Sequence, residues 1–335
     1  MKDHSSSFIS LTDCCLYYKG AIIKRGGTMS EILKVNGQTV YFQSSKEMSD
    51  IPSNSVPFII TSPPYWHLKK YGNRNGQIGS TDYETYLDEM GRVWDDCYRV
   101  ASDGGIFVLN VNSRRNNGSF CPIAFDIYKR MSGWKLWDVL IWYIPNALPQ
   151  CNHYMERLFD NKFEYLLVFL KGSPDKYKFH KPRVPQKYLH ADPRNHKKNK
   201  RGRCIGNIIR IPAYRPPNVK QLGYHEAAFP EELVALMLES FTDPGDTVLD
   251  PFLGSGTTLK VCRVMKRSGL GYEINEGYRE LIDRRINETW EIPDWKKLDI
   301  LHSSTMTPGM NQSRKIHFHK KDTALALLSG GQLFE

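Results

Sequence analysis

Apolar and polar residues are arranged along the chain in two patterns, each of which predicts a different kind of element. Short unbroken apolar runs, typical of buried strands, lie at 58–61, 106–111, 137–143, 163–170, 247–249 and 270–273. Stretches with an apolar residue every three or four positions, which predict helices, lie at 82–99, 122–131, 230–241, 257–266 and 275–286. Because strands alternate with helices, we expect an α/β fold with a doubly wound, mostly parallel sheet.

The first of these strands ends in an unusual sequence, Ser62-Pro63-Pro64-Tyr65-Trp66. Two consecutive prolines fix φ near about −65° and remove the donors that a sheet ladder needs. None of the usual turn residues, Gly, Asn or Asp, is present. The sequence therefore predicts a stiff arm whose carbonyl oxygens have no partner in secondary structure. An ordinary proline-rich loop is the alternative.

A later strand ends in the sequence DPFLGSGTT, which begins at Asp250 and opens the next helix. Gly254 and Gly256 allow the backbone to approach a ligand closely. The following strand ends at Glu273, where a carboxylate can accept hydrogen bonds from ribose hydroxyls. The Gly-Lys-Ser/Thr ending of a phosphate-binding loop and the third glycine of a dinucleotide fingerprint are both missing. A carboxylate at Asp250 disfavours phosphate and suits a cationic cofactor.

The net charge of +10 is concentrated in one part of the chain. The segment from Lys171 to Leu222 holds 15 Lys or Arg residues and two Asp. It also contains aromatic residues, a combination that favours a polyanion, and nucleic acid above all. A solvated basic surface is the plainer alternative.

Cysteine usage and hydropathy exclude several classes of protein. The seven cysteines include no C-x-x-C pair and no zinc spacing, which indicates a reducing cytoplasm. The sequence HEAAF at 225–229 lacks the second His of a zinc-protease motif, so we expect no metal. No apolar run approaches the ~20 residues that span a bilayer, so no membrane partner is expected.

Together, these motifs resemble the amino-methyltransferases of bacterial and archaeal restriction–modification systems. The stretch 250–258 matches that family's cofactor loop, D-P-F-x-G-S-G-T-T, and 61–65 matches its catalytic motif. The stretch 225–230 resembles its H-x-A-x-F-P element. Further matches are 142–149 with Arg157, 163–165 and 271–273, so the resemblance covers roughly residues 37–290. The catalytic motif precedes the cofactor loop, as in the family's β group.

The resemblance implies a circularly permuted, Rossmann-like methyltransferase fold that binds S-adenosyl-L-methionine and double-stranded DNA. The cofactor-binding residues it implies are Asp250, Pro251, Phe252, Gly254, Ser255, Gly256, Thr257, Glu273, Phe229 and Pro230. The catalytic residues are Ser62, Pro63, Pro64 and Tyr65, and the expected DNA contacts are Lys197, Lys198, Lys200, Arg201 and Arg203. Thr257 is also expected to cap its helix. Where the family often has an acidic residue near the cofactor's adenine, this chain has Gln43-Ser44-Ser45.

The resemblance also implies the reaction. Ser62 and the Pro63 carbonyl are expected to hold an exocyclic amine of a base extruded from the duplex, with Tyr65 stacked on that base. Serine at the first motif position resembles the N4-cytosine group, whereas N6-adenine enzymes more often have Asp or Asn. No cysteine lies in the Pro-Cys motif of carbon-5 methylation, so we expect direct transfer without a covalent intermediate. Adenine N6 methylation is the nearest alternative, and a non-catalytic DNA-binding protein is a more distant one.

These expectations divide the chain into five segments. Residues 1–28 are expected to be a leader or disordered tail, with translation starting at Met29. Residues 29–170 form the catalytic half, 171–222 an inserted target-recognition region, and 223–297 the cofactor-binding half. Residues 298–335 form a C-terminal tail. The expected role is protection of host DNA from a cognate restriction endonuclease.

Overall fold

The computed structural model describes residues 22–25, 28–66, 78–79, 81–116, 118–149, 157–184, 203–213 and 230–292. Its strands are β1 (Ile22–Arg25), β2 (Thr28–Val35), β3 (Gln38–Phe42), β4 (Val56–Thr61), β5 (Ala101–Val111), β6 (Arg114–Asn116), β7 (Ser119–Cys121), β8 (Lys135–Tyr143), β9 (Phe163–Leu170), β10 (Arg183–Val184), β11 (Arg203–Cys204), β12 (Ile208–Arg210), β13 (Thr247–Asp250) and β14 (Ser268–Tyr272). Its helices are α1 (Tyr83–Val100), α2 (Ile123–Lys129), α3 (Glu231–Phe241), α4 (Thr257–Val264), the 3₁₀ helix η2 (Glu276–Tyr278) and α5 (Arg279–Asn287). None of the described helices is long and apolar enough to cross a membrane.

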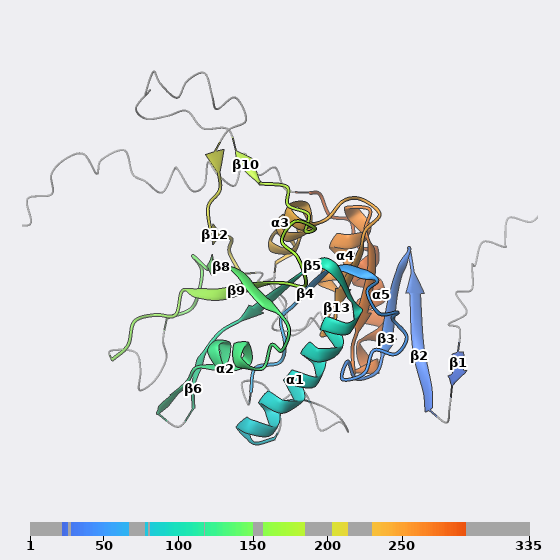
Figure 1. Cartoon of the computed structure of the whole chain (residues 1–335), viewed down its shortest axis with the longest axis horizontal. Helices are drawn as coiled ribbons and strands as arrows, with labels where there is room; N and C mark the ends of the chain where they lie inside the picture. Colours follow the sequence, from blue (N-terminus) through green and yellow to red (C-terminus); the bar gives the residue numbers. More distant parts are fainter. Residues whose placement is uncertain are drawn as a thin grey trace, which may run out of the picture. The chain divides into compact units, whose positions relative to one another are not determined.

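Ten strands form one sheet in the order β1-β2-β3-β14-β13-β4-β5-β9-β8-β12 (Figure 1). The central block from β3 to β5 is parallel throughout, which confirms the predicted α/β class. Strand β9 is antiparallel to both of its neighbours, β5 and β8. Parallel strands place their carboxyl ends at the same edge of a sheet, and this edge is called the carboxyl edge below; the amino edge lies opposite.

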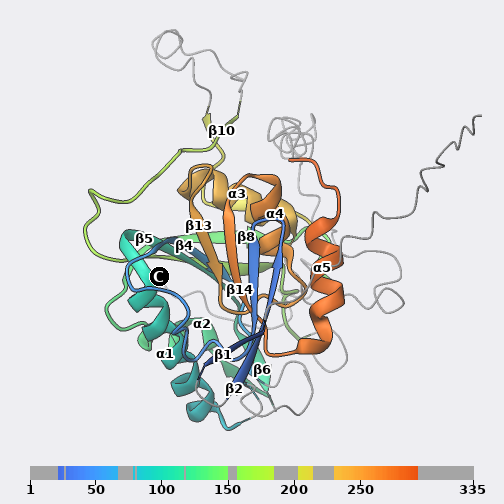
Figure 2. The ribbon, with the colours of Figure 1, turned by 90° about the vertical axis from the view of Figure 1, so that its right-hand side faces the viewer.

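Helices cover both faces of the sheet because successive side chains of a strand point to opposite faces. On β4, Phe58 stacks against Phe241 of α3, with ring centroids 5.9 Å apart. The next residue, Ile59, packs into the core cluster that contains the buried side of α1. Figure 2 shows α1 and α2 on one side of the sheet and α3, α4 and α5 on the other.

Helix α1 begins where its sequence predicts. The Asp82 side chain accepts a hydrogen bond from the backbone N–H of Thr85 at 3.0 Å, which caps the first turn. Its buried face consists of Tyr86, Leu87, Met90, Val93, Trp94, Cys97 and Val100. The predicted helix at 275–286 is instead divided, because the Asn275 side chain accepts from the N–H of Gly277 and forms η2 before α5 starts.

The hairpin of β2 and β3 was not predicted. Its turn is Asn36-Gly37, with φ of 47° and 76°, so both central residues are left-handed as in a type I′ turn. An Asn-Gly pair between apolar residues is a strong hairpin signal, and this one was overlooked. Residues 22–25, which we expected in a leader or tail, form β1 and pair with β2. Thr28, also in that segment, begins β2, and residues 1–21 and 26–27 lie outside the described residues.

The first part of the basic segment, residues 171–180, lies along the amino edge of the sheet. Lys178 forms ion pairs with Asp243 and Asp246, at 3.0 and 2.7 Å, in the turn that precedes β13. The ring of His180 is 2.9 Å from Asp243. Lys176 pairs with Asp103 near the start of β5. These cations therefore dock the chain onto its own acidic turns, and charge counting alone had assigned them to a polyanion partner.

Lys171 is also part of the fold. Its ammonium donates to the carbonyls of Tyr98 and Ala101, both at 2.6 Å, and to the Asn54 side chain at 2.8 Å. It lies 4.7 Å from the centroid of the Tyr98 ring. Burial lowers the pKa of this ammonium, and the charge of Asp103 opposes that shift.

We predict that Lys171→Met destabilises the protein by about 2 kcal/mol, because two carbonyls and one amide oxygen lose their donor. Lys181→Met, at an exposed position of the same segment, should change stability by less than about 0.5 kcal/mol. Urea unfolding of both variants measures the difference. Equal changes in the free energy of unfolding would show that the hydrogen bonds of Lys171 add no more stability than an exposed lysine does.

Candidate active site

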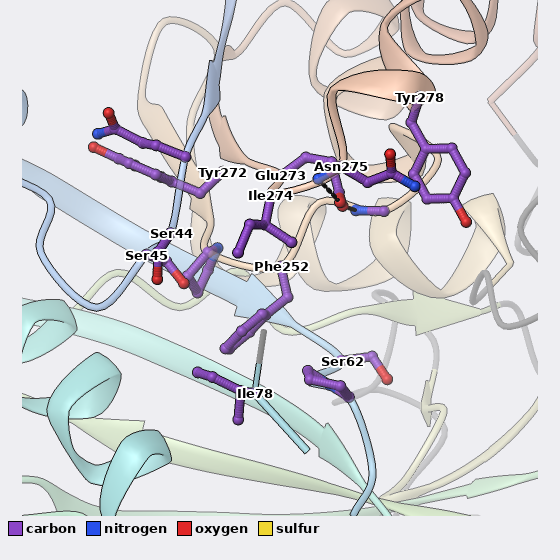
Figure 3. Close-up of a pocket in the computed structure, with 14 residues that line it drawn as sticks. Ser44, Ser45, Ser62, Ile78, Phe252, Tyr272, Glu273, Ile274, Asn275 and Tyr278 are labelled. Atoms are coloured by element: carbon purple, nitrogen blue, oxygen red, sulfur yellow. Dashed lines mark hydrogen bonds between the residues drawn. The ribbon is translucent and has the colours of Figure 1, made fainter. Parts of the chain in front are cut away.

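The two sequence motifs meet at the carboxyl edge because their strands are neighbours. Strand β13 pairs with β4 in parallel, with Val248 opposite Phe58 and Leu249 opposite Ile59. Both strands therefore end at the same level. Ser62 and Pro251, the residues that follow them, line one pocket (Figure 3).

The pocket is open to solvent, and the space between its walls and in its mouth amounts to about 750 Å³. Its walls come from five places in the sequence. The lining residues are Gln43, Ser44, Ser45, Ser62, Pro64, Ile78, Pro251, Phe252, Gly254, Tyr272, Glu273, Ile274, Asn275 and Tyr278. Figure 3 shows Ser44 and Ser45 on one side, Phe252 between them and Ser62, and Glu273 with Asn275 at the far end.

Asp250 lies behind this pocket and does not line it. Its side chain is 1% exposed. One carboxylate oxygen accepts from the Thr61 hydroxyl at 2.6 Å and from the Phe252 N–H at 3.0 Å. The other accepts from the Thr258 hydroxyl at 2.6 Å. We expected Asp250 to face the cofactor. In the structure its carboxylate instead joins the end of β4 to the start of α4.

Burial raises the pKa of Asp250 to about 6, and the hydrogen bonds from Thr258 and Thr61 oppose this shift. The raised pKa reflects a carboxylate removed from water with three hydrogen-bond donors and no cation among its bonded partners. The ionised Asp250 side chain is therefore stabilised by three neutral hydrogen-bond donors.

The glycine loop and Glu273 form the floor of the pocket. Gly254 and Gly256 have φ of 57° and 92°, in the left-handed region that favours glycine. The Glu273 carboxylate accepts from the N–H of Gly254 at 2.9 Å and from the N–H of Asn275 at 2.7 Å. These bonds fix its orientation while it lines the pocket. A Cβ at Gly271 would lie 2.7 Å from Leu253, so only glycine fits between this strand and the loop.

Three other residues of the predicted cofactor set lie beneath the pocket. Ser255, Gly256 and Thr257 are buried and do not line it. Gly256 occupies the N-cap position of α4, where no side chain caps the helix, so the expectation that Thr257 caps it is wrong. The Thr257 hydroxyl instead accepts from Arg285 at 3.2 Å.

Pro230 is buried at the N-cap of α3, while Phe229 lies outside the described residues. The next residue, Glu231, is 4% exposed and pairs with Lys260 at 3.1 Å and Arg285 at 3.0 Å. Lys260 reaches in addition to Glu288 at 2.9 Å. This buried network connects the starts of α3 and α4 with α5 and was not predicted.

The catalytic motif leaves the sheet as a braced arm. The Pro64 carbonyl accepts from the Tyr86 hydroxyl at 3.1 Å. No donor among the described residues reaches the carbonyl of Pro63. Ser62 and Pro64 line the pocket, so the arm's first residues and the cofactor loop share one space.

Tyr65 is partly buried, does not line the pocket, and reaches strand β9 with its hydroxyl. Its hydroxyl donates to Glu164 at 3.1 Å, and the same carboxylate oxygen accepts from Asn110 at 2.9 Å. Burial raises the pKa of Glu164, and these two hydrogen bonds oppose the shift. Burial and then the charge of Glu164 hold the pKa of Tyr65 well above its usual value. Sequence reasoning matched Glu164 to the family but missed this role.

Trp66 is held in the same way. Its indole N–H donates to the Thr81 carbonyl at 2.8 Å, and its own carbonyl accepts from Arg114 at 2.6 Å. Its ring lies 4.8 Å from that of Tyr83. The two aromatics that looked exposed in the sequence are therefore both anchored by their polar atoms.

The predicted DNA contacts are not tested by this geometry. Lys197, Lys198, Lys200 and Arg201 lie outside the described residues, and Arg203 is described only as the backbone of β11. Within the described ranges, no group of three or more His, Cys, Asp or Glu side chains lies close enough to hold a metal ion.

The family model described as DNA methylase, which covers N6 and N4 enzymes, matches residues 56–284. The chain belongs to the N6/N4 DNA methylase family. It is a DNA methyltransferase of the restriction–modification type, as its motifs predicted.

Curated relatives agree with this assignment. The type II methyltransferase M.MjaI of Methanocaldococcus jannaschii is 30% identical over 281 residues, covering 74% of this chain and 90% of the relative. M.SmaI of Serratia marcescens is 30% identical over 262 residues, covering 68% and 83%. The structure of the cytosine-N4-specific PvuII DNA methyltransferase aligns with a TM-score of 0.59 at 20% identity, covering 79% of this chain and 91% of that one. This last likeness shows the fold alone.

The pocket of this methylase fits S-adenosyl-L-methionine, the cofactor of the family. When bound, the cofactor supplies a methyl group activated by a positively charged sulfur. Glu273 offers a fixed carboxylate for ribose hydroxyls. Phe252 and Ile274 could provide apolar surface for an adenine ring, and Gln43, Ser44 and Ser45, the stretch where the family often has an acid, also line the pocket. The pocket's apolar walls and its single carboxylate suit a nucleoside that carries a cation.

We predict that Asp250→Asn changes the pH dependence of stability. The folded pKa of about 6 lies above the usual Asp value of 3.8, so the folded state holds its proton more tightly than the unfolded state. The stability that this protonation contributes is present below about pH 4 and is lost as the pH rises through 6. Relative to the Asn variant, the native protein should therefore lose on the order of 3 kcal/mol between about pH 4 and about pH 7.5.

Urea unfolding of both proteins at the two pH values measures this difference, and all other titrating groups cancel between them. A stability difference that does not change with pH would show that Asp250 titrates as an exposed carboxyl does.

Proposed function

We propose that this methylase transfers a methyl group from S-adenosyl-L-methionine to the exocyclic N4 of cytosine at a specific sequence in duplex DNA. One observation carries the proposal. Ser62 lines the cofactor pocket, and next to it the carbonyl of Pro63 has no donor among the described residues. Two acceptors are thus presented beside the position of a methyl donor.

Those acceptors match what an aromatic amine needs. The lone pair of an exocyclic amine is delocalised into the ring, which makes the nitrogen a poor nucleophile. Hydrogen bonds from its two N–H groups to the Ser62 hydroxyl and the Pro63 carbonyl would hold the nitrogen nearer to tetrahedral geometry and localise the lone pair. Because Pro64 is bonded to Tyr86, the acceptors are in place before the base arrives.

Tyr65 completes the base site in this proposal. The target amine cannot be reached inside a stacked duplex, so the cytosine must rotate out and find another surface to stack on. The Tyr65 ring adjoins Ser62, and its bond to Glu164 fixes the plane of the ring. Glu164 and Asn110 therefore act as positioning residues for the stacking surface.

Transfer is a single displacement. The N4 nitrogen forms a bond to the methyl carbon as the carbon–sulfur bond breaks, and one N4 proton leaves to solvent. No covalent enzyme–base bond is needed. Of the described cysteines, Cys97 and Cys262 are buried in the core. The Ser62 motif favours cytosine over adenine N6, which remains the alternative for the same site.

The biological role in this proposal is protection of host DNA from a cognate endonuclease with the same target sequence. The catalytic motif at 61–65 and the cofactor loop at 250–258 are both intact in the sequence, which disfavours a non-catalytic DNA-binding role.

Base identity tests the proposal directly. DNA methylated by the purified protein, digested to nucleosides and separated by chromatography with mass detection, should contain N4-methylcytosine. N6-methyladenine as the sole product would show that the target is the N6 amine of adenine, the alternative for the same site. Absence of any methylated nucleoside, together with absence of S-adenosylmethionine binding in calorimetry, would favour the non-catalytic role.

We predict that Tyr65→Ala lowers turnover by about 5- to 150-fold, because stacking of a base on an aromatic ring contributes about 1–3 kcal/mol. Tyr65→Phe serves as the matched control, since it keeps the ring and loses only the bond to Glu164. It should retain most of the activity. The affinity for S-adenosylmethionine, measured by calorimetry, should stay within about twofold in both, because Tyr65 does not line the pocket. Parallel losses of cofactor binding and turnover would contradict the stacking role.

A further inference from the structure

The hairpin of β6 and β7 stands at the carboxyl edge, directly beside the catalytic arm. It starts three residues after the end of β5, the neighbour of β4, with Arg114 opposite Cys121 and Arg115 opposite Phe120. Figure 1 shows it extending away from the sheet, and in Figure 2 β6 and β10 lie at opposite ends of the view. None of the sequence motifs included this hairpin.

The base of the hairpin is fixed to the catalytic arm. The Arg114 guanidinium donates to the carbonyl of Trp66 at 2.6 Å, one residue after Tyr65. Cys121, across the hairpin from Arg114, packs against the main core cluster. Any movement of the hairpin base is therefore transmitted to the arm that carries Ser62 and Tyr65.

The outer part of the hairpin presents a cation and a ring to solvent. Phe120 is 56% exposed, and the guanidinium of Arg115 lies 5.6 Å from its ring centroid. Arg115 is also exposed. The stretch from Asn112 to Cys121 contains two arginines and no acidic residue. This distinguishes it from the amino edge, where Lys176 and Lys178 are neutralised by aspartates of the fold.

We propose that this hairpin is a DNA-binding arm, in which Arg115 contacts a backbone phosphate and Phe120 inserts into the base stack next to the extruded nucleotide. The inference rests on the proposed function. Extrusion leaves a gap in the stack, and apolar or aromatic wedges stabilise such distorted duplexes. A guanidinium suits phosphate through parallel N–H donors. Both groups stand on an element bonded to the catalytic arm, so the wedge and the base site keep a fixed separation.

The experiment uses duplex oligonucleotides that contain the sequence found methylated in cellular DNA. One duplex is fully paired, and a second has the target base mispaired, so that extrusion costs less. Phe120→Ala should lower kcat/KM at least tenfold on the paired duplex and less than twofold on the mispaired one. Phe120→Leu, which keeps an apolar wedge, should remain near wild type on both. Phe179→Ala, at a ring that is 46% exposed on the segment along the amino edge, is the control and should change neither.

Arg115→Gln tests the phosphate contact. It should reduce the slope of log affinity against log salt by about 1 without changing the methylated sequence, because one fewer counterion is released. Lys176→Gln, at an exposed cation of the segment along the amino edge that Asp103 already neutralises, should leave the slope unchanged. The proposal would be overturned if Phe120→Ala lowered kcat/KM equally on the two duplexes, or if Arg115→Gln kept the wild-type salt slope.

Failure of the hairpin proposal can be distinguished from failure of the proposed function. Affinity for S-adenosylmethionine should be unchanged in every hairpin variant, and thermal unfolding identifies any variant that fails to fold. If the methylated base proves to be adenine, the proposed function fails, whereas the comparison of paired and mispaired targets still decides the role of the hairpin.

Discussion

The site depends on one buried carboxylate. Asp250 lies 189 residues from Thr61 in sequence, yet it accepts that residue's hydroxyl, the Thr258 hydroxyl and the Phe252 N–H. These bonds join the strand that carries the acceptors to the loop and helix that form the cofactor pocket. Pairing of β4 with β13 brings the two strand ends to one level, and the carboxylate fixes their spacing. Burying this carboxylate costs desolvation free energy, which is why its pKa is raised. The three hydrogen-bond donors offset part of that cost.

Rigidity around the catalytic arm leaves few polar atoms available for chemistry. Tyr86 bonds to the carbonyl of Pro64, Glu164 holds Tyr65, and Thr81 holds the indole of Trp66. The Ser62 hydroxyl and the Pro63 carbonyl are what the arm presents beside the pocket. A site arranged in this way needs little reorganisation when a base enters, and such preorganisation is the main source of electrostatic catalysis. The prolines alone would stiffen the arm, but its direction is set by tertiary hydrogen bonds.

Local signals in the sequence were sufficient for the alternation of strands and helices, the position of α1 and the glycine loop at the end of β13. The β2–β3 hairpin had a signal in Asn36-Gly37 that was overlooked. Other features had none. The role of Asp250 follows from which strand lies next to β13, and no local pattern contains that information. The charge count did not reveal the partners of Lys176 and Lys178 for the same reason, because those aspartates lie 65 or more residues away in the sequence. Composition records charges but not their pairing.

The two edges of the sheet have opposite electrostatic roles, which constrains how DNA can approach. A base that reaches Ser62 must enter at the carboxyl edge, where the β6–β7 hairpin carries arginines and no acid. The cations of residues 171–180 lie at the amino edge, separated from Ser62 by the length of a strand, roughly 17–20 Å. They are also neutralised by Asp103, Asp243 and Asp246. Among the described residues, the cations that could attract a duplex docked for catalysis are therefore those beside the catalytic arm, as proposed above for the hairpin.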